Sequence, residues 1–277
     1  MLAYEPSELE RSSTAFDATK TLSRGKIFVL NRDENLDGRI DIDDLRWEYL
    51  EEDGDFRSDE VTALRDEADI IITNPPFSLF REYMAWIMEA GKRFVVIANK
   101  NCITYKEIFP LIKDNKMWAG NGFHGGNAFF RTIHDSSNYS EGVYDEETKL
   151  VKFRNVDWFT NIEHGRRHQP ILLMTMADNL KFPTKMQGRA GYDRYDNYDA
   201  IDVPFTKTIP SDYDGVMGVP ISFLEKYCPG QFEIIGATES EGKGFSQGLW
   251  DPQSGVAQAT ISGNRVYKRI FIRKRTS

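Results

Sequence analysis

Hydrophobic residues follow two different periods in the first half of the chain. Continuous apolar runs at 68–73 and 93–98 indicate strands of a parallel sheet that is covered on both faces. Between the two runs, apolar side chains recur at helical spacing and Gly91 stands where a left-handed C-cap is expected; the helical positions are Leu79, Phe80, Tyr83, Met84, Trp86, Ile87 and Met88. Strand, helix and strand in this order predict a right-handed βαβ unit.

Further patterns extend this unit on both sides. The run Lys26–Leu30 predicts a buried strand, and Ser58 is a plausible N-cap for a short helix that ends near Asp66. We also expect a helix around 105–112 and late strands at 232–236 and 266–272. These elements predict an α/β fold with a doubly wound sheet. Ligands of such sheets bind at the carboxyl ends of the strands, which is where residues 74–77 are expected to lie.

The chain shows neither an internal repeat nor a low-complexity linker, so we predict a single domain over residues 1–277. Its middle is less regular. The Gly-rich stretch 119–127 predicts loops or tight turns, and residues 135–215 mix polar, aromatic and charged side chains. We therefore expect an irregular insertion at about 135–215.

Composition excludes several classes of protein. An apolar content of 40% is enough for a sizeable core and excludes a disordered chain. Two distant cysteines support neither a zinc ribbon nor a disulfide framework, and no apolar stretch approaches the ~20 residues of a membrane span. Without a signal-peptide pattern, the cytoplasm is the expected location and no membrane partner is expected. A net charge of −8 argues against coating of nucleic acid by bulk charge, although a local basic face stays open.

The sharpest chemical signal is Asn74-Pro75-Pro76-Phe77, directly after an apolar strand. Asn followed by two prolines is also common in plain turns. Methylation of an exocyclic amino nitrogen needs acceptors for both N–H groups, because the nitrogen lone pair is otherwise delocalised into the ring. The Asn74 side-chain oxygen and the Pro75 carbonyl are suited to this, the prolines hold them in place, and Phe77 is suited to stack on an extruded base. The motif in this context predicts a methyltransferase.

Several blocks of the sequence resemble one known family. They are 53–58, 72–83, 103–110, 161–167, 212–220 and the final strand from Arg265, and together they span about residues 25–275. They are similar to the EcoRI-type adenine-specific DNA methyltransferases. The resemblance implies the class I (Rossmann-like) methyltransferase fold, S-adenosyl-L-methionine as cofactor, and methyl transfer to N6 of adenine in double-stranded DNA. The resemblance also implies either a cognate restriction endonuclease or an orphan methyltransferase that has none.

The same resemblance assigns Asp55 and Phe56 to the cofactor. In the family, an acidic side chain accepts a hydrogen bond from the adenine amino group and an aromatic ring packs on the base. On the residues alone, a solvated acidic turn before the helix at Ser58 explains this segment equally well. The family's first strand and the loop that holds the methionine half of the cofactor have no counterpart in this sequence. We therefore expect an N-terminally truncated chain with weak cofactor binding.

An acidic segment offers a competing interpretation. Residues 33–44 carry oxygen ligands, a central Gly38 and a final carboxylate, Asp44, at the spacing of a calcium loop. The preceding run Lys26–Leu30 is strand-like, however, so the entering helix of such a module is missing. An acid-rich surface loop between two sheet elements is the preferred interpretation. The pair His164 and His168 lacks a carboxylate partner at helical spacing, so we predict no metal site.

Basic residues gather in the middle of the chain. Taken singly, each is better explained as part of a solvated surface, but as a group in the inserted segment they are the candidates to contact DNA phosphates, with Tyr192, Tyr195 and Tyr198 among them. The candidates are Arg166, Arg167, Lys181, Lys185, Arg189 and Arg194. The alternatives to a DNA methyltransferase are a methyltransferase acting on RNA or on protein glutamine, a truncated remnant that only binds DNA, and a calcium-responsive module.

Overall fold

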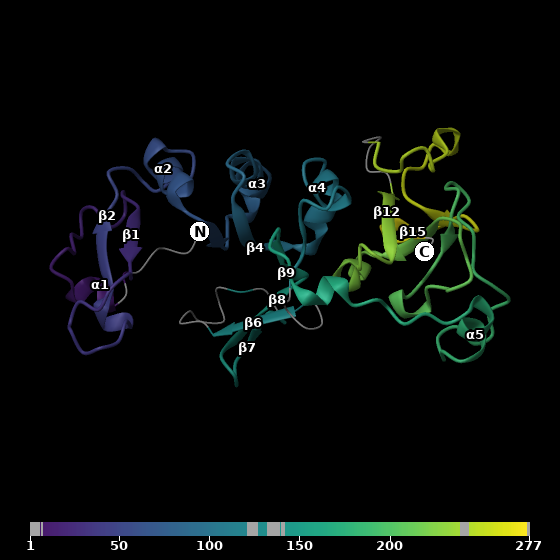
Figure 1. Cartoon of the computed structure of the whole chain (residues 1–277), viewed down its shortest axis with the longest axis horizontal. Helices are drawn as coiled ribbons and strands as arrows, with labels where there is room; N and C mark the ends of the chain where they lie inside the picture. Colours follow the sequence, from purple (N-terminus) through teal and green to yellow (C-terminus); the bar gives the residue numbers. More distant parts are fainter. Residues whose placement is uncertain are drawn as a thin grey trace.

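The computed structural model describes residues 6, 8–120, 127–131, 139, 142–238 and 244–275. Figure 1 shows the elements spread along the longest axis nearly in sequence order, from a small ribbon at one end to a second sheet at the other. The helices are α1 (Glu8–Ser12), α2 (Asp59–Glu67), α3 (Phe80–Glu89), α4 (Phe109–Lys113) and α5 (Met176–Lys181). Ser58 caps α2 as predicted, because its side chain accepts the Val61 N–H. The helix expected around 105–112 is shorter and begins at Phe109.

The first ribbon pairs β1 (Lys26–Val29) with β2 (Arg46–Tyr49) in antiparallel register. The strand at Lys26 is therefore confirmed, but the prediction that it is buried is wrong. Phe28 is 44% exposed, because the ribbon has two strands and cannot cover both of its faces. Sequence reasoning missed β2, whose charged and aromatic residues alternate. The acidic residues 31–44 form the connection between the two strands, as the preferred interpretation expected.

The first large sheet has the strand order β3-β4-β9-β5, with β3 (Ile70–Thr73), β4 (Arg93–Asn99), β9 (Val156–Thr160) and β5 (Trp118–Ala119). β3 and β4 are parallel, and α3 lies between them in the chain. This confirms the predicted strand–helix–strand unit. β9 runs antiparallel to both of its neighbours, so the sheet is mixed and not purely parallel.

The two faces of this sheet are covered differently. α2, α3 and α4 lie in a row on one side of it, and a small sheet of β6 (Asn127–Arg131), β8 (Leu150–Arg154) and β7 (Tyr144–Asp145) lies on the other (Figure 1). Phe94 and Val96 of β4 are fully buried, whereas Ile72 of β3 is 71% exposed. The expectation that residues 68–73 are covered on both faces is therefore wrong. β3 is an edge strand in the described structure and shows one face to solvent.

A second sheet has the order β10-β11-β15-β12, with β10 (Ile201–Asp202), β11 (Met217–Pro220), β15 (Arg269–Lys274) and β12 (Phe232–Ala237). Both late strands are thus confirmed, although β15 begins three residues later than expected. One hydrophobic core runs from α3 and β4 into this sheet, and Phe94, Phe159, Phe223 and Ile272 all belong to it. A short hairpin of β13 (Thr260–Ile261) and β14 (Asn264–Arg265) completes the strands described.

The segment 135–215, expected to be an irregular insertion, contains part of the framework. β9 lies within it and is the strand between β4 and β5. Tyr195 and Tyr198, expected among the DNA-facing residues, are instead 6% and 3% exposed and pack with Phe271 in a second small core. Large aromatic rings bury much apolar area, so their position beside basic residues in the sequence did not decide their exposure.

Candidate active site and nucleic-acid interface

Asn74 to Phe77 lie where the sequence predicts, between the carboxyl end of β3 and the first turn of α3. Asn74 and Pro76 are exposed, and Pro75 is buried. Neither proline has an N–H to continue the β ladder, so the strand ends here. The Pro76 carbonyl accepts the Leu79 N–H at 3.0 Å, which starts a single 3-10 turn, Phe77–Leu79, leading into α3. The motif thus occupies a tight strand–turn–helix junction.

Asn74 and Phe77 line a pocket of about 280 Å³. Its floor includes Ile97 of β4 and Val156 of β9, and its wall comes from the β6–β8 sheet and from Tyr139. The remaining lining residues are Phe130, Arg131, Val151 and Phe153. The rings of Phe130 and Phe153 meet edge to face, with centroids 5.4 Å apart. A pocket with four aromatic rings, counting Phe77 and Tyr139, is suited to a flat aromatic ligand.

Three of the side chains that line this pocket can form hydrogen bonds: Asn74, Arg131 and Tyr139. Among the residues described, no hydrogen bond is formed to the Asn74 side chain or to the Pro75 carbonyl. The exposed Asn74 side chain lines the pocket, whereas Pro75 is buried and is not among the lining residues. Arg131 is the cationic group of the lining. Sequence reasoning missed Phe130, Arg131, Tyr139 and Phe153, because they lie more than fifty residues beyond the motif and no local pattern connects them to it.

Asp55 and Phe56 lie close together but do not line the Asn74 pocket. The Asp55 carboxylate is held by its neighbour Arg57, with Oδ2 to Nη2 at 2.6 Å and Oδ1 to Nε at 2.9 Å. These hydrogen bonds lower the pKa of Asp55 to about 2, so the group is a carboxylate at neutral pH. Phe56 is 8% exposed and packs edge-on against Tyr83 and Trp86 of α3.

The six basic residues predicted to contact DNA do not form one cluster. Arg167 is 5% exposed: its guanidinium stacks on Trp118 at 3.7 Å from the ring centroid and pairs with Glu163. It is a buried packing residue and does not face solvent. Arg189 and Arg194 are exposed, and each pairs with a nearby carboxylate, Asp193 and Asp199.

Lys181 and Lys185 remain exposed at and just beyond the end of α5. Their amino groups lie over aromatic rings, 5.1 Å from the Phe182 centroid and 5.0 Å from the Phe205 centroid. Phe182 is itself 57% exposed. An exposed cation beside an exposed ring is a pattern that the sequence analysis expected, although with other aromatic residues.

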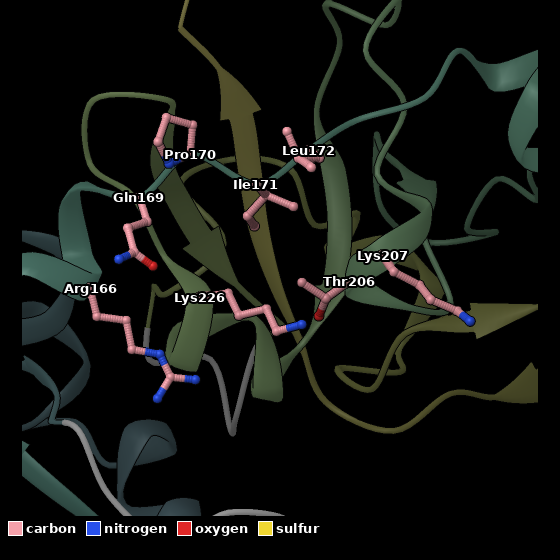
Figure 2. A pocket seen from close by; sticks show the side chains of 8 residues that line it. All are labelled: Arg166, Gln169, Pro170, Ile171, Leu172, Thr206, Lys207 and Lys226. Atoms are coloured by element: carbon pink, nitrogen blue, oxygen red, sulfur yellow. The ribbon is translucent and has the colours of Figure 1, made fainter.

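Arg166 lies in a different basic surface, which sequence reasoning missed. It lines an open pocket of about 400 Å³ together with Lys207, Lys226 and five uncharged residues. Figure 2 shows the extended segment Pro170–Leu172 passing beside the Lys226 side chain, with Arg166 and Lys207 to either side. The lining holds three cations and no carboxylate. Lys207 and Lys226 lie far from Arg166 in sequence, so only the fold brings the three together.

Carboxylate oxygens of the acidic loop, residues 31–44, accept hydrogen bonds from backbone N–H groups of the same loop. The Asp33 carboxylate accepts the Asp37 and Gly38 N–H groups, and the buried Asp44 carboxylate accepts those of Glu34, Asn35 and Asp41. Among the described residues, no group of three or more His, Cys, Asp or Glu side chains is arranged to hold a metal ion. His164 and His168 contact the Ala119 carbonyl and Glu163, respectively. In the same part of the chain, no helix has the length and apolar character needed to cross a bilayer.

Comparison with known proteins defines the class. A family model described as adenine-specific methyltransferase EcoRI matches residues 2–275. The type II methyltransferase M.EcoRI of Escherichia coli is 43% identical over 263 residues, which cover 94% of this chain and 73% of that protein. Type II methyltransferases of Mycoplasma genitalium and Mycoplasma pneumoniae are 31% and 34% identical, over 81% and 73% of this chain and 70% and 60% of their own lengths. No solved structure gives a significant match.

The protein is therefore a methyltransferase. More narrowly, the chain belongs to the adenine-specific EcoRI methyltransferase family, as the resemblance in its sequence blocks predicted.

Proposed function

We propose that this protein transfers a methyl group from S-adenosyl-L-methionine to N6 of an adenine in double-stranded DNA, with the adenine turned out of the helix into the pocket at Asn74. The observation that carries the proposal is the aromatic pocket of about 280 Å³ at the carboxyl end of β3. Family membership supports the methyl transfer and the choice of adenine. Among the alternatives, RNA or glutamine acceptors and a DNA-binding remnant are distinguished by the experiment below.

The proposed role of Asn74 and Pro75 is to bind the amino group. The Asn74 side-chain oxygen and the Pro75 carbonyl each accept one N–H of the adenine N6 amino group. This draws the nitrogen toward a tetrahedral shape and frees its lone pair for attack on the methyl group. Two consecutive prolines restrict the backbone, so the acceptors are oriented before the substrate arrives and little reorganisation is needed during the reaction. The positive nitrogen that forms loses its proton readily, so no general base is required before transfer.

The rings of the pocket hold the base. Phe77 is 46% exposed and lines the pocket together with the Phe130–Phe153 pair. Stacking of a base on aromatic side chains is worth about 1–3 kcal/mol per base, enough to offset a good part of the cost of unstacking. The β6–β8 sheet therefore has a substrate-binding role in this proposal, in addition to the motif itself.

Asp55 and Phe56 fit the adenosine half of the cofactor in chemical type. Asp55 is ionised and provides an acceptor for the adenine amino group, while Phe56 provides a ring for the base, although Arg57 now contacts both. When bound, the cofactor supplies the electrophilic methyl group on a sulfonium sulfur. In this proposal β3, α3 and β4 are one βαβ unit of a doubly wound class I sheet, with Asn74 and the cofactor at the same strand ends.

We assign contacts with DNA phosphates to cations that are exposed or, like Arg166, half-buried at the surface. Arg166, Lys207 and Lys226 line one basic pocket, and Lys181 and Lys185 lie near α5. Arg189 and Arg194 contact a DNA phosphate only if the phosphate replaces their carboxylate partners, Asp193 and Asp199. Most of these residues belong to segment 135–215 or lie close to it in sequence. Arg167 is left out of this surface because it is buried. A cognate restriction endonuclease stays a prediction.

The test is Asn74→Ala, compared with Ser78→Ala, an exposed neighbour that does not line the pocket. We expect Asn74→Ala to abolish tritiated methyl incorporation into adenine-containing duplex DNA while circular dichroism and the melting temperature stay unchanged. Ser78→Ala should retain wild-type rates. Wild-type incorporation by Asn74→Ala contradicts the assignment of the site. If the wild-type chain methylates RNA or protein but not DNA, the proposed acceptor is wrong. If the wild-type chain binds DNA but transfers no methyl group, the result supports a truncated remnant that only binds DNA.

A further inference from the structure

Arg57 contacts both groups that the proposed cofactor site offers to an adenine. Its side chain binds the Asp55 carboxylate, and its guanidinium lies over the Phe56 ring. We propose that Arg57 is a gate on the adenosine site: without cofactor it takes the place of the adenine ring, and it turns away when a nucleoside binds. The inference rests on the assignment of Asp55 and Phe56 to the cofactor in the proposed function.

The first observation concerns the carboxylate. Oδ1 of Asp55 accepts the backbone N–H of Arg57 and its Nε, both at 2.9 Å, and Oδ2 accepts Nη2 at 2.6 Å. A carboxylate offers about four acceptor positions, so one residue fills most of them. An adenine amino group is a donor of the same kind. It therefore competes directly with Nη2 for the Oδ2 atom.

The second observation concerns the ring. The guanidinium carbon of Arg57 lies 5.4 Å from the centroid of the Phe56 ring. Tyr83 and Trp86 meet the same ring at angles of 69° and 70°, that is, edge-on. Both belong to α3 and are fixed by the helix, whereas the Arg57 side chain is 56% exposed. A guanidinium and an adenine are both planar and both stack on aromatic faces, so either group fits the same position.

Glu82 is a second ion-pair partner for Arg57. Its Nη1 atom lies 3.3 Å from Oε2 of Glu82, an exposed residue of α3. When Arg57 releases Asp55, a turn toward Glu82 keeps its charge paired. Exposed ion pairs are weak, so opening the gate is expected to change the affinity for a nucleoside only a few-fold. The gate is therefore reversible under ordinary solution conditions.

The experiment compares the wild-type chain with Arg57→Ala by isothermal titration with S-adenosylhomocysteine and, separately, adenosine. We expect Arg57→Ala to bind both about two- to fivefold more tightly, because the nucleoside no longer displaces a side chain. Trp86 lies 5.6 Å from Phe56, so a change in tryptophan fluorescence on binding is expected as well. Unchanged or weaker binding by Arg57→Ala overturns the gate.

Three further variants separate the gate from the site itself. Arg81→Ala removes the same charge from α3, where Arg81 lies over Tyr105, and should bind like wild type. Glu82→Gln removes the second partner and should weaken binding about twofold; tighter binding contradicts the release route. Asp55→Asn should abolish binding in both the wild-type and Arg57→Ala backgrounds. If Asp55→Asn has no effect, or no variant binds either ligand, the proposed cofactor site is wrong; if only the Arg57→Ala gain is missing, the gate alone is wrong.

Discussion

The two faces of the β3–β4 pair perform different tasks. On the face toward α3 and α4, Phe94 and Val96 are fully buried in the main core. On the opposite face, Ile97 lines the Asn74 pocket and Ile72 lines a neighbouring pocket of about 300 Å³ that also contains Val95 and Trp158. Successive residues of one strand thus alternate between holding the fold together and forming the walls of pockets. Apolar character alone does not tell these tasks apart.

The largest effect is expected from the covered face. Phe94→Ala should lower the free energy of unfolding by about 3–5 kcal/mol, because it leaves a cavity in a core that cannot fully collapse. Ile72→Ala, on the same pair of strands but 71% exposed, should cost less than about 1 kcal/mol. Urea unfolding of both variants measures the difference. Similar losses for the two would show that the open face is packed in solution.

The open face is probed by its aromatic wall. Phe153→Ala should lower kcat/KM for duplex DNA by about tenfold, since one stacking partner of the base is lost. Phe129→Ala is the matched control, because Phe129 is a half-exposed ring of the same small sheet that does not line the pocket. We expect Phe129→Ala to retain wild-type kinetics. Equal losses in both variants would mean that the small sheet acts through its stability and not through the pocket.

The covered face also holds a charge, and its titration gives a smaller effect. Asp157 of β9 lies beside Lys100, and burial raises the pKa of Asp157 above its usual value of 3.8. The folded state therefore binds this proton more tightly than the unfolded state. Its contribution to stability is complete below pH 3.8 and is lost as the pH rises through the raised pKa.

Asp157→Asn should remove this slope. The difference in urea midpoint between the variant and the wild-type chain is expected to grow in favour of the variant as the pH rises from about 4 through that window. A difference that stays constant with pH would mean that the proton is not coupled to folding.

At the acidic loop, residues 31–44, we expect calcium to have no effect on stability. The Asp33 and Asp44 carboxylates already accept backbone N–H groups, and the element before the loop is β1 rather than a helix. Addition or chelation of calcium should leave the melting temperature unchanged, because only a ligand that prefers the folded state raises it. Saturable stabilisation at micromolar calcium that is lost in Asp33→Ala would contradict this prediction.

The sequence predicted those parts of the molecule in which local pattern and burial agree. The β3–α3–β4 unit, the Ser58 cap and the position of Asn74–Phe77 at a strand end were all readable, because each depends on residues close together in the chain. The sequence did not reveal which face of 68–73 is covered, since Ile70, Ile71 and Ile72 are equally apolar. The side on which a strand has a neighbour is set by tertiary structure.

The site was predictable to a similar extent. The motif and the Asp55-Phe56 pair were found, but the pocket wall at Phe130 and Phe153 depends on the β6–β8 sheet folding over Asn74. The charge of Arg167 predicted exposure, whereas stacking on Trp118 and pairing with Glu163 offset the cost of burying its guanidinium. Arg57 was not singled out, because nothing in the sequence indicates that a basic residue would cover its own neighbours.

The composite origin of the Asn74 pocket limits how its chemistry can be moved to another protein. The motif contributes two of the nine lining residues, and the others come from β4, β6, β8, β9 and Tyr139. A graft of Asn74–Phe77 into a foreign strand–helix junction would carry the acceptor oxygens without the rings that hold a base. A transferable unit has to extend at least from β3 to β9, with the three-stranded β6–β8 sheet intact, so the smallest portable active site is itself a substantial part of a domain.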